Sequence, residues 1–166
     1  MTIVLIGPPA AGKTRVGKRL ARRLGVPFID TDAVIVAKHG PISGIFAERG
    51  EQEFRAIERT VVSEALALGG VVSFGGGAVL DPRTQEDLRT THVVLLTVTP
   101  EAAAARITDG KRPLVQGIES WRELVGKRLP LYESLADYTA DTSHRPMTTI
   151  VEEIAQWCEE QEQAEA

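Results

Sequence analysis

The 166-residue chain has little of several features that mark specialised protein classes. It contains one cysteine, Cys158, so no internal disulfide framework can hold the fold together, and we expect its thiol to be inert. No apolar run approaches the ~18 residues that a membrane-spanning helix needs. A net charge of −4 provides no overall basic field to attract nucleic acid or an anionic membrane. The apolar stretch 2–6 is too short for the core of a secretory signal, so we expect a cytoplasmic protein.

The remaining composition is that of an ordinary globular domain, with 43% hydrophobic and 25% charged residues. Five short apolar segments, each bounded by turn residues, predict strands at 2–6, 26–30, 71–74, 92–98 and 138–141. Helical periodicity predicts helices at 12–24, 32–38, 41–68, 119–129 and 149–160. The helical stretch 41–68 should consist of two pieces that meet near Gly50, and Pro130 should end the helix at 119–129. We expect the acidic tail at 159–166 to fray. Strands that alternate with helices predict one α/β domain over 1–166, with a parallel sheet covered on both faces.

The segment GPPAAGKT, Gly7 to Thr14, matches the phosphate-loop pattern G-x-x-x-x-G-K-[ST] and lies between a predicted strand and a predicted helix. Three backbone N–H groups would cradle a β-phosphate: those of Ala11, Gly12 and Lys13. The Lys13 ammonium would reach the β- and γ-phosphates, and the Thr14 hydroxyl would ligate Mg²⁺. The motif predicts binding of a nucleoside triphosphate but leaves GTPases, motor ATPases and small-molecule kinases open.

Ala10 stands at one of the four free positions of this motif. A left-handed backbone there would cost roughly 1–2 kcal/mol because of the Cβ atom, and a methyl facing the phosphates would push the nucleotide away. Pro8 and Pro9 stiffen the start of the loop, so less entropy is lost when the loop is ordered. We expect the loop to keep its usual shape and to support activity.

Acidic and glycine-rich segments follow the second and third predicted strands. Asp30 and Asp32 lie at the end of a strand whose carboxyl edge should face the phosphate loop, where Mg²⁺ or a hydroxyl donor would stabilise both carboxylates. An N-cap role for the following helix is the alternative. The run FGGGAV (74–79) would let a ligand approach bare backbone N–H groups, unless it is a plain strand-to-helix turn.

Three arginines stand at positions that would suit anion binding: Arg55, Arg112 and Arg128. Arg55 lies in EQEFRAIE, Arg112 in a loop rich in helix breakers, and Arg128 just before LPLY. Arginine binds planar carboxylates through two hydrogen bonds and stabilises charge on a transferring phosphoryl group. Any one of them could equally be a solvated surface residue.

Taken in order, the segments GPPAAGKT, DTD, IFAERGEQEFRAIE, FGGGAV, KRPLV and KRLPLYE resemble those of shikimate kinases over residues 3–145. The resemblance implies a nucleoside-monophosphate-kinase-like fold with a five-stranded parallel sheet of order 2-3-1-4-5. It also implies MgATP-dependent phosphorylation of the 3-hydroxyl of shikimate, on the route to chorismate and aromatic amino acids. A monomer with a helical acceptor-binding region at 31–62 and a mobile lid at 108–117 is expected.

The same resemblance implies roles for individual residues. Lys13, Asp32 and Arg112 would be catalytic, with Asp32 orienting or activating the hydroxyl and Arg112 folding over the phosphates from the lid. Mg²⁺ would lie near Thr14 and Asp30. The nucleotide would contact Gly7, Ala10, Ala11, Gly12, Lys13, Thr14, Arg106, Arg112 and Arg145. Shikimate would contact Asp32, Phe46, Phe54, Arg55, Glu58, Gly76, Gly77 and Arg128, with Glu58 orienting an arginine.

Two other classes of function fit part of this pattern. A sister kinase of the same fold could act on gluconate or on a nucleoside monophosphate, since paired arginines do not exclude a phosphate-bearing acceptor. A nucleotide-binding switch without turnover would keep GPPAAGKT but would have no need for DTD, Arg55 and Arg128 together.

Overall fold

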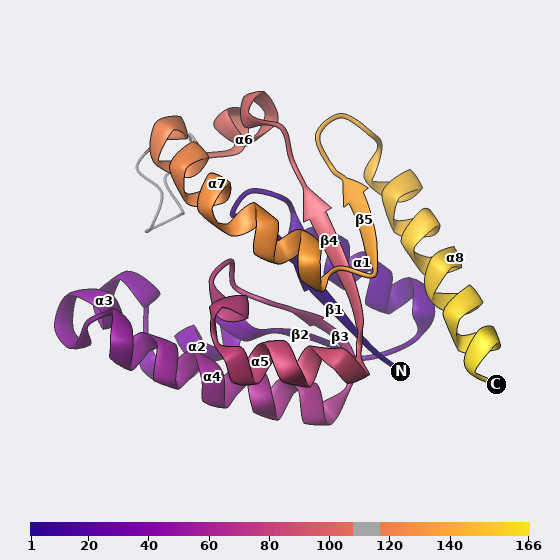
Figure 1. The fold of residues 1–166 in the computed structure, drawn as a ribbon, viewed down its shortest axis with the longest axis horizontal. Coiled ribbons are helices and arrows are strands. Elements are labelled where there is room, and N and C mark those ends of the chain that lie inside the picture. Colours follow the sequence, from indigo (N-terminus) through magenta and orange to yellow (C-terminus); the bar gives the residue numbers. More distant parts are fainter. Residues whose placement is uncertain (108–116) are drawn as a thin grey trace.

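The computed structural model describes residues 1–107 and 117–166 as a five-stranded parallel sheet with helices on both faces (Figure 1). The strands are β1 (Thr2–Ile6), β2 (Phe28–Asp30), β3 (Gly70–Ser73), β4 (His92–Thr97) and β5 (Tyr138–Asp141). Their order is β2-β3-β1-β4-β5, and every neighbouring pair is parallel. The predicted sheet, including its strand order, is confirmed. All of the expected lid at 108–117 except Gly117 lies outside the described residues.

The helices are α1 (Lys13–Leu24), α2 (Thr31–His39), α3 (Ile42–Arg49), α4 (Glu51–Leu68), α5 (Pro82–Asp87), α6 (Pro100–Ile107), α7 (Ile118–Leu135) and α8 (Met147–Glu165). Two short 3₁₀ turns, η1 (Ala78–Leu80) and η2 (Leu88–Thr90), flank α5. The predicted break of 41–68 near Gly50 is confirmed, because Gly50 separates α3 from α4. Within the described parts of the chain, no helix combines the length and the apolar character that crossing a membrane would require.

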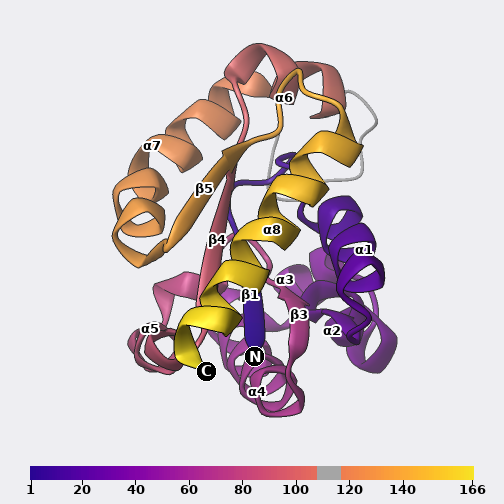
Figure 2. The same ribbon diagram turned by 90° about the vertical axis from the view of Figure 1, so that its right-hand side faces the viewer.

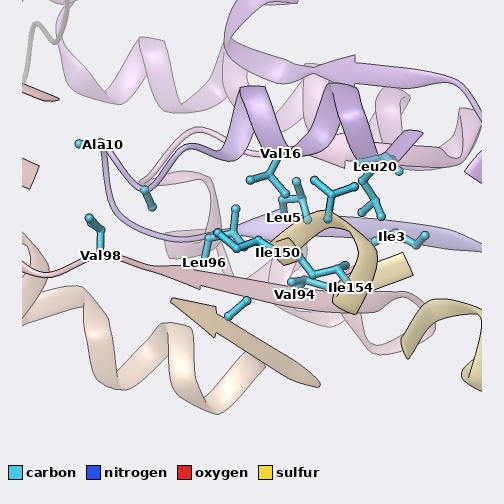
Figure 3. Packing of buried hydrophobic residues seen from close by; sticks show 14 of the residues in the cluster. Ile3, Leu5, Ala10, Val16, Leu20, Val94, Leu96, Val98, Ile150 and Ile154 are labelled. Atoms are coloured by element: carbon cyan, nitrogen blue, oxygen red, sulfur yellow. The ribbon is translucent and has the colours of Figure 1, made fainter. Parts of the chain in front are cut away.

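Successive side chains of the central strands point to opposite faces of the sheet and are buried on both, as the two-residue period of a strand requires. Ile3 and Leu5 of β1 pack in one cluster with Val16 and Leu20 of α1 and with Ile154 of α8 (Figure 3). The other face is covered by α4 and α7, whose Val62 and Tyr132 pack with Val4 and Ile6. Helices α1 and α8 lie side by side although they come from opposite ends of the chain (Figure 2).

Two sequence predictions about helix ends are wrong. Helix α7 does not stop at Pro130 but continues to Leu135. A proline inside a helix removes one backbone hydrogen bond. Burial of Arg128 and Tyr132, on either side of Pro130 and on one face of the helix, offsets that loss. The acidic tail does not fray, because α8 is helical to Glu165, whose Oε1 lies 3.2 Å from His92 Nε2.

The loop after β1 contains the least ordinary backbone of the described chain. Gly7 has a φ of 145°, and an added Cβ atom would collide with the backbone carbonyl oxygen of Leu96, so only glycine fits. Among the described residues, Ala10 is the sole non-glycine residue with a positive φ, at 71°. Its side chain is 3% exposed and belongs to the same apolar cluster as Val98 (Figure 3). Ala10 therefore carries the left-handed strain, but within a packed environment.

We predict that Ala10→Gly leaves the protein folded and changes its nucleotide affinity little. Removing the Cβ relieves roughly 1–2 kcal/mol of left-handed strain. The loss of a buried methyl opposes this by about 0.8 kcal/mol, and the freer unfolded chain by about 0.4–1 kcal/mol. The melting temperature should thus shift by only a few degrees, and the ATP KM by less than about tenfold, or ~1.4 kcal/mol.

Ala11→Gly is the matched control, because Ala11 is fully buried and has no positive φ. It should lower the melting temperature without any compensating relief of strain. A wild-type protein that bound no ATP until Ala10 was replaced by glycine would show instead that the alanine spoils the loop.

Candidate active site

A cavity of about 820 Å³ opens where β1, β2 and β3 end, at the carboxyl edge of the sheet. Ligands of open parallel sheets bind at this edge, beside the point where the strand order reverses. The cavity brings the phosphate loop together with the predicted acceptor residues. Its lining includes Gly12, Lys13, Thr14, Asp30, Asp32, Phe54, Arg55, Glu58, Gly76, Gly77 and Arg128.

The phosphate loop ends in the N-terminus of α1, which begins at Lys13 after Gly12. The first turn of α1 contains no acidic residue, so its backbone N–H groups present positive potential toward the cavity. The Lys13 ammonium lies across the loop and donates to the carbonyl oxygens of Gly7 (2.7 Å) and Pro8 (2.9 Å). This end of the cavity is built to receive an anionic group.

Thr14 and Asp30 lie next to each other at the base of the loop. The Thr14 hydroxyl donates to Asp30 Oδ2 at 2.6 Å, and Asp30 Oδ1 accepts from the backbone N–H of Ala33, which caps α2. Asp30 therefore serves as the N-cap and also faces the phosphate loop. The described residues hold no cluster of three or more His, Cys, Asp or Glu side chains that could bind a metal. A hydroxyl beside one carboxylate nevertheless fits Mg²⁺, which keeps several waters and takes phosphate oxygens as ligands.

Asp32 lies in the first turn of α2, and its carboxylate faces the glycine run after β3. Burial raises the pKa of Asp32 above its ordinary value, and the nearby charge of Asp30 raises it further. The positive charges of Lys13 and Arg55 act in the opposite direction. Asp32 is thus a partly desolvated carboxylate that feels the charges of Lys13 in the phosphate loop and of Arg55.

Each of the three glycines after β3 makes room for a different charged side chain. A Cβ atom on Gly75 would lie 2.5 Å from Asp32 Oδ1, and one on Gly77 would lie 2.5 Å from Arg55 Nη1. At Gly76, a Cβ atom would lie 3.3 Å from Arg128 Nη1. None of the three has a positive φ, so the constraint here comes from space: a Cβ atom would displace the Asp32 carboxylate at Gly75 and the Arg55 guanidinium at Gly77. The run FGGGAV is therefore more than a turn between a strand and a helix.

Arg55 is hydrogen-bonded to one carboxylate and ion-paired with a second, while two of its donors lack a hydrogen bond. Its Nη1 donates to Glu58 Oε1 at 2.8 Å, and Glu58 is only 3% exposed. Burial raises the pKa of Glu58, whereas the Arg55 guanidinium lowers it. Among the described residues, Nε and Nη2 of Arg55 are the buried side-chain polar atoms without a hydrogen-bond partner, although Nη2 lies 3.5 Å from Glu51 Oε1 in an ion pair. Such donors are costly unless a ligand satisfies them.

Of the two predicted aromatic residues, Phe54 lines the cavity and Phe46 does not. The Phe54 ring lies 4.8 Å from that of Phe46, measured between centroids. The Arg55 guanidinium carbon lies 5.1 Å from the centroid of the Phe54 ring. Phe46 therefore packs against Phe54 and is not itself among the residues that line the cavity.

The three arginines expected at the nucleotide have different positions. Arg106, at the end of α6, donates to the carbonyl oxygens of Ala10 (2.8 Å) and Thr142 (2.6 Å), beside the phosphate loop. Arg145 donates to Glu153 at 2.6 Å and is not among the residues that line the cavity. Arg112 lies outside the described residues.

Sequence reasoning missed three side chains that support the site. The Tyr132 hydroxyl donates to the carbonyl oxygen of Gly76 at 2.5 Å, and burial raises its pKa. Trp121 and Thr142 donate to carbonyl oxygens of the phosphate loop. Tyr132 lies in the segment KRLPLYE, from which only Arg128 is predicted as a site residue, and no motif marks Trp121 or Thr142. The spacing of Trp121, Arg128 and Tyr132 does place them on one helical face, but only if the helix continues through Pro130.

Comparison with known proteins gives a consistent result. A family model described as shikimate kinase matches residues 9–159. The shikimate kinase of Thermobifida fusca is 50% identical over 157 residues, covering 92% of this chain and 91% of the relative. That of Mycobacterium tuberculosis (strain CDC 1551 / Oshkosh) is 44% identical over 158 residues, covering 91% and 89%.

The comparison with solved structures gives the same family as the comparison of sequences. Shikimate kinase from Acinetobacter baumannii, solved in complex with shikimate, superposes with a TM-score of 0.90 at 35% identity and covers 96% of this chain and 93% of that one. A gluconokinase from Sinorhizobium meliloti superposes with a TM-score of 0.59 at 22% identity, covering 92% and 87%, and shares the fold alone. This chain belongs to the shikimate kinase family.

Proposed function

We propose that this chain transfers the γ-phosphoryl group of ATP to the 3-hydroxyl of shikimate. The unsatisfied donors of Arg55, in the same cavity as the phosphate loop, are the observation that carries the proposal. Together with Arg128 they form a cationic end that suits a small carboxylate. The relative from Acinetobacter baumannii, which was solved with shikimate, supports this choice of acceptor.

At the nucleotide end, the chain supplies positive charge and backbone donors. The N-terminus of α1 and the Lys13 ammonium would neutralise phosphate charge that develops in the transition state. Arg106, beside Ala10, would contact the nucleotide, and Arg112 would complete the charge over the phosphates. Thr14 and Asp30 would hold Mg²⁺, which neutralises the β- and γ-phosphates when bound.

At the acceptor end, the side chains mainly position the substrate. Arg55 and Arg128 would bind the carboxylate, and Phe54 would pack against the ring. The carboxylate of Asp32 would accept a hydrogen bond from the 3-hydroxyl and aim it at the phosphoryl group. Its raised pKa makes it a better proton acceptor, while Lys13 and Arg55 favour its ionised form. The acceptor region at 31–62 comprises α2, α3 and α4 as far as Val62.

The proposal also covers the oligomeric state of the enzyme, its metal requirement and its location. The enzyme would be a magnesium-dependent monomer in the cytoplasm. The monomer is favoured by a described surface on which the exposed large hydrophobic side chains are Met1, Val36, Leu68 and Leu80. The thiol of Cys158 is buried, which raises its pKa to about 12 and makes it unreactive. Light scattering tests the monomer, and chelation by EDTA tests the metal requirement.

A coupled assay of ADP release tests the proposed reaction directly. The purified chain is assayed with MgATP alone and with shikimate, gluconate or nucleoside monophosphates. Turnover that depends on shikimate is expected, and Lys13→Ala serves as the inactive control because the phosphates lose their main cationic partner. Turnover with gluconate or a nucleotide and none with shikimate would overturn the proposal.

We predict that Asp32→Asn lowers kcat by about 10²–10⁴-fold, the usual contribution of a general base or orienting carboxylate. The KM for ATP should change little, because Asp32 faces the acceptor rather than the nucleotide. Steady-state kinetics with both substrates varied measures the two effects separately. An unchanged kcat would remove Asp32 from the mechanism.

The same substitution should stabilise the protein at neutral pH. Because the pKa of Asp32 is raised in the folded state, folding disfavours its ionised form. The free energy of unfolding should therefore fall as the pH rises from the unfolded-state pKa through the folded-state pKa. An asparagine side chain cannot ionise, so the variant should melt at a higher temperature than the wild type at pH 7, and the difference should vanish in acid.

We predict that Arg55→Lys and Arg128→Lys each raise the KM for shikimate by about 10- to 100-fold, as expected for lost hydrogen bonds to a charged group. Lysine keeps the charge but loses the two parallel donors that match a carboxylate. Arg59→Lys is the matched control, since Arg59 lies on α4 like Arg55 but pairs with Asp87 and is not among the residues that line the cavity. Normal shikimate KM values in both variants would refute the assignment.

We predict that Gly77→Ala also weakens shikimate binding, because the new methyl would displace the Arg55 guanidinium. The KM for shikimate should rise by about tenfold or more, while ATP binding is unaffected. Gly126→Ala is the control, because a Cβ atom there meets open space on a helix, where alanine is favoured. Equal kinetics for the two variants would contradict the role given to the glycine run.

A further inference from the structure

Side chains from three other elements hold three successive carbonyl groups of the phosphate loop. The Pro9 oxygen accepts from Trp121 Nε1 at 2.7 Å, and the Ala10 oxygen accepts from Arg106 Nη1 at 2.8 Å. The Ala11 oxygen accepts from the Thr142 hydroxyl at 2.7 Å. These donors belong to α7, α6 and the residue directly after β5.

Two of the three donors are buried and have no part in the proposed contacts to either substrate. Trp121 is 2% exposed and Thr142 is 4% exposed. The backbone N–H of Thr142 donates to the Thr97 carbonyl at 2.8 Å, so this residue is tied to β4. The Thr142–Ala11 hydrogen bond is buried and the Trp121–Pro9 bond is partly buried, so the loss of either donor would leave a poorly solvated carbonyl without its partner.

The carbonyl contacts determine where the loop's N–H groups point. In a trans peptide the C=O and the N–H of the next residue point in opposite directions. No cis peptide occurs among the described residues. The Pro9, Ala10 and Ala11 carbonyls therefore direct the N–H groups of Ala10, Ala11 and Gly12 to the side of the loop away from Trp121, Arg106 and Thr142. The Ala11 N–H donates to the Pro8 carbonyl oxygen at 3.3 Å, so this N–H already has a partner within the loop.

The contacts also stabilise the strained part of the loop. Ala10, with its φ of 71°, lies between the two peptide groups whose carbonyls Trp121 and Arg106 hold. A residue held in a sparsely populated conformation persists only where its surroundings over-determine it. Without these donors, the loop could relax toward conformations in which its N–H groups no longer converge on a phosphate.

We propose that Trp121 and Thr142 are positioning residues for phosphoryl transfer, which hold the phosphate loop in its anion-binding conformation before the nucleotide arrives. The inference rests on the proposed ATP-dependent reaction. Preorganising the loop removes an ordering cost that nucleotide binding would otherwise carry. Neither residue is among those that line the cavity, so each would act through the backbone of the loop.

Trp121→Phe and Thr142→Val each remove the donor while keeping most of the side-chain volume. Each should weaken ADP binding, measured by calorimetry, by about tenfold. Each should also raise the KM for ATP similarly, while the KM for shikimate stays within about twofold. Thr142→Ser keeps a hydroxyl and should restore ADP affinity. Trp157→Phe is the matched control, because Trp157 stacks on Tyr138 and lies on α8.

A spectroscopic readout separates loop positioning from a general effect on folding. The chain contains two tryptophans, so Trp157→Phe leaves Trp121 as the sole indole. Its fluorescence should change when ADP is added and should not change with shikimate alone. Wild-type ADP affinity in both Trp121→Phe and Thr142→Val would overturn the proposal, and so would equal losses of ADP and shikimate affinity. Because ADP binding is read without turnover, a failure of the proposed reaction would be recognised separately.

Discussion

The site depends on how closely β1 and β4 approach each other where β1 ends. The two strands pair in parallel up to Ile6 and Leu95, and the chain then turns at Gly7 against the Leu96 carbonyl. Only a residue without a Cβ atom fits there, and the turn aims the following loop over the carboxyl edge of the sheet. The apolar cluster formed by β1, β4, α1 and α8 holds this junction in place. The phosphate loop is therefore positioned by the core of the sheet together with the glycine at which the loop begins.

The charged groups gathered at the carboxyl edge of the sheet lower the stability of the folded protein. Burial raises the pKa of both Asp32 and Glu58, and two donors of Arg55 lack hydrogen bonds. Each of these features disfavours the protein without its ligand. The glycine run leaves room for these groups, because a side chain at Gly75 would displace the Asp32 carboxylate and one at Gly77 would displace the Arg55 guanidinium. Binding an anion and a hydroxyl in this cavity would satisfy groups that folding alone leaves unsatisfied.

Helix α7 connects the two ends of the cavity. One face carries Trp121, which contacts the phosphate loop, then Arg128 in the cavity lining, then Tyr132, which holds the Gly76 carbonyl. A single rigid helix thus sets the separation between the nucleotide end and the acceptor end. Tyr132 occupies this face only because the helix continues through Pro130. Burial of Arg128 and Tyr132 outweighs the local preference of proline to end a helix.

Local and periodic features were readable from the sequence alone. The phosphate loop, the five strands and their parallel alternation with helices, and the break at Gly50 all follow from short-range patterns. The resemblance to shikimate kinases supplied the strand order and the acceptor residues, and Arg55, Glu58 and Arg128 do lie in one cavity. What only the tertiary structure decided involves partners far apart in the chain. The donors to the phosphate-loop carbonyls, the side chains packed against each glycine, the continuation of α7 and the ordered end of α8 depend on contacts that no local pattern encodes. They arise because burial and hydrogen bonding between distant segments outweigh the small conformational preferences of single residues.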